Sequence, residues 1–201
     1  MRHIESYGLE NPLQEITARI RQRTGRKIVN VLDVGGAAGI ALKDVKKQDP
    51  QVSTWNMTMD MEPVTYDTDK TYLCIAERFP AELRESADLI ISNYSFCYFP
   101  CQARALENCL QSLSIGGEAH LNISFGKQDI FVKNSANRMR QEYDRLASLK
   151  DSGKIELEVN GWEGEKHALV YQPSNYRESE QEREHFYPPA FVRIRKLKSL
   201  A

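Results

Sequence analysis

The sequence predicts an α/β fold in which a mostly parallel, doubly wound sheet carries helices on both faces. Short apolar segments alternate along the chain with amphipathic segments, which is the order that such a sheet requires. The run 27–34 is rich in apolar, β-branched residues and has an acidic residue near its end. It passes directly into a glycine-rich turn. A strand, a tight turn and a helix in that order form the unit with which α/β proteins hold ligands at the carboxyl ends of their strands.

The expected elements follow in chain order. Apolar residues at helical spacing predict helices over 10–23, 40–47 and 102–114, the last ended by Gly116 and Gly117. The remaining apolar segments before residue 126 predict five strands, because they are short, rich in β-branched residues and bounded by turn residues. These strands are expected over 27–34, 52–57, 71–76, 87–93 and 118–125.

The C-terminal third predicts a helix over 131–149, followed by alternating segments over 155–159 and 167–172 that would form an antiparallel edge of the sheet. The dense mixed-charge run 176–185 is expected to be either an exposed helix or a flexible insert. The segment 191–197 alternates apolar and basic residues, so it predicts a last strand that closes the sheet or meets a partner.

Length and composition limit the classes of protein. With 201 residues the chain is expected to form one domain, with a lead-in over 1–26, a core over 27–126 and a C-terminal part over 127–201. A net charge of −1 argues against nucleic-acid or anionic membrane partners. No signal peptide begins the sequence and no apolar run approaches the ~20 residues of a membrane span, so the expected location is the cytoplasm. The oligomeric state stays open.

Cysteines and histidines show no spacing typical of a metal site. Three residues separate Cys97 from Cys101, and no second pair completes a zinc site. Cys74 lies in an expected strand and Cys109 on an expected helix, where free thiols pack as small apolar groups. We therefore expect no metal and no disulfide framework.

The spacing of the glycine-rich turn narrows the ligand. A phosphate-binding P-loop needs a Lys-Ser/Thr pair after its last glycine, where this chain has Ile40. A dinucleotide fingerprint needs glycine at the positions of Ala37 and Ile40. The pattern that remains is Asp-x-Gly-x-x-x-Gly, formed by Asp33, Gly35 and Gly39.

This pattern resembles the first motif of the class I S-adenosylmethionine-dependent methyltransferases, which usually have another glycine at the position of Ala37. Segment 87–93 resembles the fourth strand of that family. The helix after it and the run 113–117 resemble the segment that precedes the fifth strand in that family. The resemblance spans residues 28–125. It implies a Rossmann-like, mostly parallel seven-stranded sheet with an antiparallel C-terminal edge, binding of S-adenosyl-L-methionine and methyl transfer to a small-molecule or protein acceptor.

The resemblance also implies how the first turn would hold the cofactor. Asp33 would orient the turn and accept hydrogen bonds from the ammonium group of the ligand. The residues that would line the methionine part of the cofactor are Gly35, Gly36, Ala37 and Gly39.

Two further parts of the cofactor need partners. For the ribose hydroxyls, Asn56 is favoured by its place at a strand end and Asp60 by its carboxylate, and both stay open. Ala76 and Glu77 resemble the family segment that faces the adenine. Ile75 stands where that segment usually has an acidic residue.

The acceptor side follows the fourth strand. In this fold Asn93, Tyr94 and Phe96 would lie beside the transferring methyl, as catalytic candidates, with Asn93 also touching the cofactor. Asn93 and Phe96 stand at the positions of the Asn/Asp-Pro-Pro-Tyr/Phe motif, but both of its prolines are missing. The aromatic residues here either line an apolar acceptor pocket or belong to the core. Asn93 also replaces the aspartate of the ribose 2′-O-methyltransferase tetrad, which argues against that subclass.

Two functions of different class remain. The first is a methyltransferase, because in-line methyl transfer depends on positioning and does not need a strong base. The second is a catalytically silent domain on the same fold that serves as a binding or regulatory module, which the departures at Ala37 and Ile75 motivate.

Overall fold

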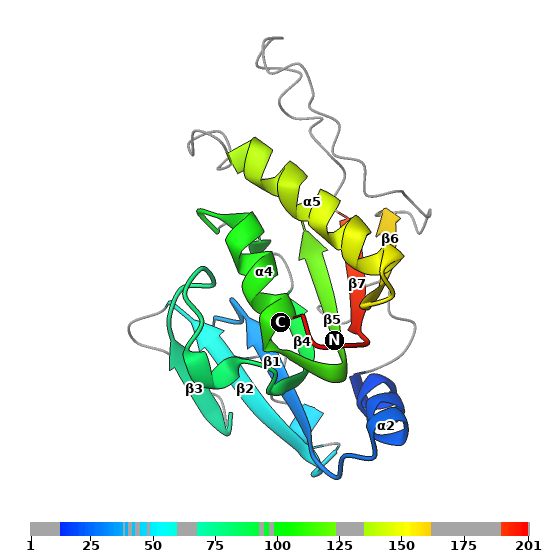
Figure 1. The fold of residues 1–201 in the computed structure, drawn as a ribbon. Helices are drawn as coiled ribbons and strands as arrows, with labels where there is room; N and C mark the ends of the chain where they lie inside the picture. Colours follow the sequence, from blue (N-terminus) through cyan, green and yellow to red (C-terminus); the bar gives the residue numbers. More distant parts are fainter. Residues whose placement is uncertain are drawn as a thin grey trace.

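The sheet is the centre of the computed structural model (Figure 1). The structure describes residues 13–37, 39, 42, 45–47, 49–59, 68–92, 95–96, 99–123, 135–161 and 190–200. The strands are β1 (Val29–Val34), β2 (Val52–Thr58), β3 (Lys70–Leu73), β4 (Ala87–Ser92), β5 (Leu113–Ile123), β6 (Ile155–Gly161) and β7 (Ala190–Lys196). They form one seven-stranded sheet of order β3-β2-β1-β4-β5-β7-β6.

Strand direction confirms the predicted sheet. Strands β3, β2, β1, β4 and β5 are mutually parallel, whereas β7 is antiparallel to both β5 and β6. The chain winds outward from β1 to β3 on one side and then returns to add β4 on the other, so the strand order reverses between β1 and β4. In such sheets ligands bind in the crevice outside the carboxyl ends of the strands at this reversal.

Helices cover both faces of the sheet. The helices are α2 (Leu13–Thr24), α4 (Gln102–Ser112) and α5 (Ser135–Asp151), with a short 3-10 turn, η1, at Ala81–Leu83. Residues 42 and 45–47 are also helical, in agreement with the helix expected after the glycine turn. None of the described helices is long and apolar enough to cross a membrane.

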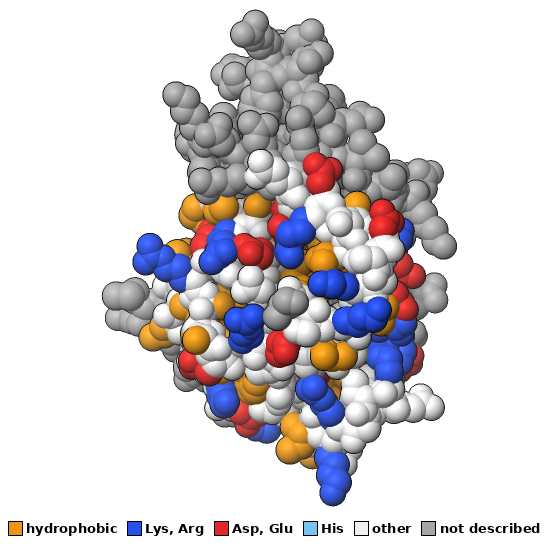
Figure 2. Space-filling model, viewed as in Figure 1, with side chains coloured by type: hydrophobic (Ala, Val, Ile, Leu, Met, Phe, Trp, Pro, Cys, Tyr) orange, Lys and Arg blue, Asp and Glu red, His pale blue; other side chains and the backbone are white. Residues whose placement is uncertain are grey.

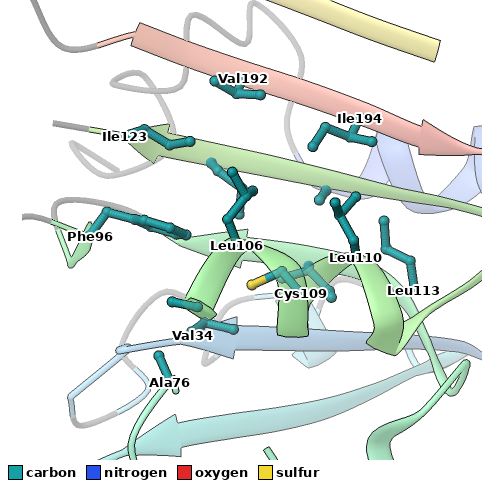
Figure 3. Close-up of a cluster of buried hydrophobic side chains, with 14 of the residues drawn as sticks. Val34, Ala76, Phe96, Leu106, Cys109, Leu110, Leu113, Ile123, Val192 and Ile194 are labelled. Carbon is teal, nitrogen blue, oxygen red and sulfur yellow. The ribbon is translucent and has the colours of Figure 1, made fainter. Parts of the chain in front are cut away.

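The core forms two layers because successive strand residues point to opposite faces. Leu32 and Val34 of β1 pack in a cluster with residues of α4 and α5, whereas Val29 and Val31 pack in a second cluster with α2. In the first layer, Leu106, Cys109 and Leu110 project from α4 onto the sheet (Figure 3). Their spacing of three and four residues places them on one helix face, as the sequence predicted.

The boundary between α4 and β5 differs from the prediction. The helix ends at Ser112, and Leu113, with φ −63° and ψ 130°, is already extended. Gly116 and Gly117 lie inside β5 and do not end the helix, which corrects that expectation. The pairing register of β4 and β5 shifts here, and Gly116 supplies the left-handed conformation, φ 83°, that the irregularity needs.

Strand β3 is shorter than expected. It ends at Leu73, so Cys74 and Ala76 lie beyond it, contrary to the prediction of a strand to residue 76. The carbonyl oxygen of Ala76 accepts a hydrogen bond from Asn108 Nδ2 at 2.9 Å. Helix α4 thus provides the partner that a neighbouring strand would otherwise offer.

Strand β7 lies inside the sheet. It pairs with β5 on one side and with β6 on the other. The side chain of Arg193 bridges Glu118 of β5 and Glu158 of β6, so the basic face meets acidic neighbours within the sheet. The expectations for a strand over 167–172 and for the run 176–185 lie outside the described residues.

Charges of both signs are mixed on the face of the molecule that Figure 2 shows. On the face drawn in Figure 2, Lys and Arg side chains alternate with Asp and Glu side chains without separating into two regions.

Candidate functional site

The candidate site lies at the carboxyl ends of β1 and β2. Asp33 of β1 and Asn56 of β2 are direct register partners, so their side chains emerge on the same face of the sheet. Both are buried, with 4% and 3% of their surface exposed. The described residues of the glycine turn, Gly35, Gly36, Ala37 and Gly39, follow β1, and Gly36 lies against this pair.

Backbone bonds hold the turn in place. Gly35 N donates to Met57 O at 2.9 Å, and Gly39 N donates to Gly36 O at 2.8 Å. Gly35 and Gly39 have φ angles of 76° and 71°, in the left-handed region that glycine adopts without strain. The sequence pattern Gly-x-x-x-Gly therefore reflects the backbone conformation at both ends of the turn.

Ala37 occupies the same left-handed region without being glycine. Its φ is 47°, a conformation that costs a residue with a Cβ about 1–2 kcal/mol. The carbonyl oxygen of Ala37 accepts a hydrogen bond from Asn56 Nδ2 at 2.9 Å. The residue at the position that departs from the family pattern is thus strained, and a side chain of β2 restrains it.

Replacing Ala37 with glycine is expected to raise the free energy of unfolding by about 1 kcal/mol, because glycine adopts the native φ without a Cβ clash. Chemical denaturation would measure the change. Ala147→Gly, at an exposed position of helix α5, is the matched control and is expected to lower stability by about 1 kcal/mol. A loss of stability in both variants would contradict the strain at Ala37.

Asp33 is electrostatically unusual. Burial raises the pKa of its carboxyl from 3.8 to about 7. The side-chain oxygen Oδ1 of Asn56 is buried beside it and has no hydrogen-bond partner among the described residues. The pair therefore offers acceptor oxygens beneath the turn, which suits a ligand that brings hydrogen-bond donors such as an ammonium group.

Gly36 lies directly against this pair. A Cβ built on it would stand 2.2 Å from Asp33 Oδ2 and 2.7 Å from Asn56 Oδ1. Both oxygens thus converge on the Cα of Gly36. The structure permits no side chain here, although the φ of this residue is not left-handed.

Ala76 and Glu77 are engaged with helix α4. Glu77 Oε1 accepts a hydrogen bond from the backbone N–H of Cys101, the N-cap residue of α4, at 2.8 Å. Ala76 is buried and its carbonyl is bound to Asn108. Glu77 thus contacts the start of α4 and Ala76 contacts its second half, and their contact with an adenine stays a prediction.

Phe96 belongs to the hydrophobic core. It is fully buried, and its ring centroid lies 5.1 Å from that of Phe99. Figure 3 shows Phe96 beside the α4 side chains, among the residues of the first core layer. The sequence left open whether the aromatic residues line an acceptor pocket or belong to the core, and Phe96 belongs to the core. Asp60, Asn93 and Tyr94 lie outside the described residues.

One contact of the site had no sequence signal. Ser95 Oγ donates to Gly35 O at 2.9 Å, and a Cβ on Gly35 would come within 2.5 Å of Ser95 Cβ. Ser95 therefore packs directly on the glycine turn. This contact depends on the parallel pairing of β1 with β4, which no local pattern around residue 95 indicates.

Comparisons identify related folds. No protein-family model matches the sequence, and no curated protein is significantly similar to it. The plantazolicin methyltransferase BamL, solved with a triazolic desmethylPZN analog and SAH, aligns with 98% of this chain and 86% of its own at TM-score 0.60 and 12% identity. BpumL, solved with a pentazolic desmethylPZN analog and SAH, aligns with 94% of this chain and 87% of its own at TM-score 0.59 and 14% identity. A putative S-adenosyl-L-methionine-dependent methyltransferase from Methanococcus maripaludis aligns with 91% of this chain and 84% of its own at TM-score 0.52 and 16% identity.

Proposed function

We propose that this chain, which has the fold of the class I S-adenosylmethionine-dependent methyltransferases, binds S-adenosyl-L-methionine at the turn after β1 and transfers its methyl group to a small-molecule or protein acceptor. The observation that carries the proposal is the buried pair Asp33 and Asn56 beneath the turn, on β1 and β2, where β1 borders the reversal of strand order. Neighbours with this fold were solved with SAH, the product that S-adenosylmethionine leaves after methyl transfer.

The residues of the turn fit such a cofactor. The Asp33 carboxylate would accept hydrogen bonds from the cofactor ammonium, and this favourable interaction would offset the cost of burying its charge. The turn around Gly36 would let the backbone approach the methionine part closely. For the ribose, Asn56 and Asp60 are the two candidates, and the segment at Ala76 and Glu77 is the candidate for the adenine.

Methyl transfer from a sulfonium group does not require a strong base. The sulfonium group of the bound cofactor supplies an activated methyl, and in-line transfer needs the acceptor atom held at short distance in a water-poor site. We propose that the segment containing Asn93 and Tyr94, which follows β4, positions the acceptor. Ser95 ties this segment to Gly35, so acceptor and cofactor sides would be held by one hydrogen bond.

Calorimetric titration of the full chain with S-adenosylmethionine and, separately, with SAH tests the proposal. Micromolar binding of both ligands is expected, and Asp33→Ala is expected to weaken each by at least tenfold because the ammonium loses its carboxylate. Asp144→Ala removes an exposed carboxylate of α5 and serves as the control, with unchanged affinity. No binding to the well-folded wild-type chain would sink the cofactor proposal.

A catalytically silent domain is the second candidate, and the strained Ala37 in the turn favours it. The variant Ala37→Gly separates the two. If the alanine merely narrows a working pocket, the glycine variant keeps or improves the affinity for SAH. Absence of binding in both forms would support a binding or regulatory module, and the search would move to protein partners.

A further inference from the structure

We infer that Asn56 is a positioning residue, which holds the strained turn at Ala37 in its ligand-binding shape, and that it leaves the ribose hydroxyls to other groups. The inference rests on the proposed function, since it assigns one of the two ribose candidates to a different task.

The first support is the use of the side-chain amide. Asn56 is 3% exposed, and its Nδ2 donates to the carbonyl oxygen of Ala37 at 2.9 Å. That carbonyl belongs to the residue with the left-handed φ of 47°. A peptide in a strained conformation persists only where its surroundings hold it. Among the described contacts, Asn56 supplies the side-chain bond that does so.

The second support is that an amide, and not a carboxylate, fits this position. A carboxylate at residue 56 has no N–H with which to bind Ala37 O. It would also place a second negative charge where Asp33 Oδ2 and Asn56 Oδ1 already converge on Gly36. Two like charges in one buried site oppose each other strongly. Asparagine is therefore the residue that supports the turn and tolerates a buried aspartate beside it.

The third support is the direction of the remaining oxygen. Asn56 Oδ1 lies 2.7 Å from the place where a Cβ of Gly36 would stand, so the turn backbone stands over it. A nearby Cβ on Gly39 would also come within 3.4 Å of the Asn56 amide carbon. Gly36 and Gly39 of the turn thus both lie close to the Asn56 side chain, as expected for a residue that holds the turn in place.

The test compares two ligands that differ in what the turn would hold. SAH carries adenine, ribose and an amino-acid part, whereas 5′-methylthioadenosine keeps adenine and ribose but lacks the amino-acid part. In Asn56→Leu, calorimetry is expected to show SAH binding weakened by at least tenfold and methylthioadenosine binding changed by less than twofold. Equal weakening of the binding of both ligands would overturn the inference, because both carry the ribose and a residue that binds the ribose would contribute to the affinity of each.

A second variant tests the link to Ala37. Adding Ala37→Gly to Asn56→Leu is expected to restore SAH affinity by at least threefold, since a glycine turn depends less on the lost bond. Thr71→Val removes a different polar group from the same row of the sheet and is expected to leave SAH affinity within twofold of wild type. Absence of rescue, or an equal loss in Thr71→Val, would overturn the inference.

The same four chains, wild type, each single variant and the double variant, form a thermal unfolding cycle without ligand. Coupling is expected: Asn56→Leu lowers the melting temperature less in the Ala37→Gly background than alone. Strictly additive shifts would refute the contact on their own. A wild-type chain that binds no SAH but shows this coupling would count against the proposed function and leave the support of the turn by Asn56 established. Where Asn56→Leu does not fold, Asn56→Ser takes its place.

Discussion

Gly36→Ala is expected to destabilise the protein by about 3 kcal/mol and to abolish cofactor binding. The new Cβ would stand 2.2 Å from Asp33 Oδ2 and 2.5 Å from Asp33 Cγ, closer than any real contact of such atoms. The carboxylate is short and buried on β1, so it has no free end that can swing away. Equilibrium denaturation in urea would measure the loss of stability, and titration with SAH would measure the loss of binding.

Gly25→Ala is the matched control for this prediction. Gly25 has a left-handed φ of 72°, but a Cβ there would meet no atom within 4 Å. Only the backbone strain remains, about 1–2 kcal/mol, and SAH affinity is expected to stay as in the wild type. The double variant Asp33→Ala, Gly36→Ala should recover part of the stability, since it removes the clashing carboxylate. Equal losses in Gly25→Ala and Gly36→Ala would show that the close approach at Gly36 is unimportant.

The contribution of Asp33 to the stability of the ligand-free protein is expected to fall as the pH rises from about 4 to about 7. The Asp33 carboxyl has a pKa raised to about 7 in the folded state, against an ordinary value of 3.8. Within this window the folded chain keeps a proton that the unfolded chain releases, so folding becomes less favourable with rising pH. The stabilising contribution is complete below pH 4 and lost above pH 7. Each pH unit in between is worth up to about 1.4 kcal/mol.

Asp33→Asn isolates this effect because asparagine mimics the protonated carboxyl in size and charge. The difference in unfolding free energy between wild type and variant, measured by urea titration at pH 4.5, 6 and 8, is expected to grow in favour of the variant by at least 1 kcal/mol. Subtraction removes the contributions of other titrating groups that both chains share. A difference that stays constant with pH would show that Asp33 is ionised at neutral pH despite its burial.

Local sequence patterns predicted those parts of the site whose geometry is decided within a few residues. The strand that contains Asp33 was recognised by its β-branched residues. The turn was recognised by its glycines, and the structure shows that Gly35 and Gly39 have positive φ angles. Helix α4 was recognised because apolar residues repeat at a period of 3.6 along it. The α/β class followed from the alternation of such elements.

Contacts between distant segments could not be predicted in this way. The support of Ala37 by Asn56 depends on the register of β1 with β2, and the contact of Ser95 with Gly35 depends on the pairing of β1 with β4. Gly116 and Gly117 look like a helix end in sequence, yet they accommodate an irregularity between two strands. Glycines permit both uses, and only the neighbouring strand distinguishes them.

The sequence by itself thus determined the fold class, the glycine turn and the acidic residue that precedes it, because backbone conformation and hydrophobic periodicity are local properties. Only the tertiary structure decided that β7 lies between β5 and β6, that Phe96 belongs to the core and that Asn56 holds the turn. These three features depend on which strands pair and in which register. That choice depends on packing over the whole sheet, which no short stretch of sequence encodes.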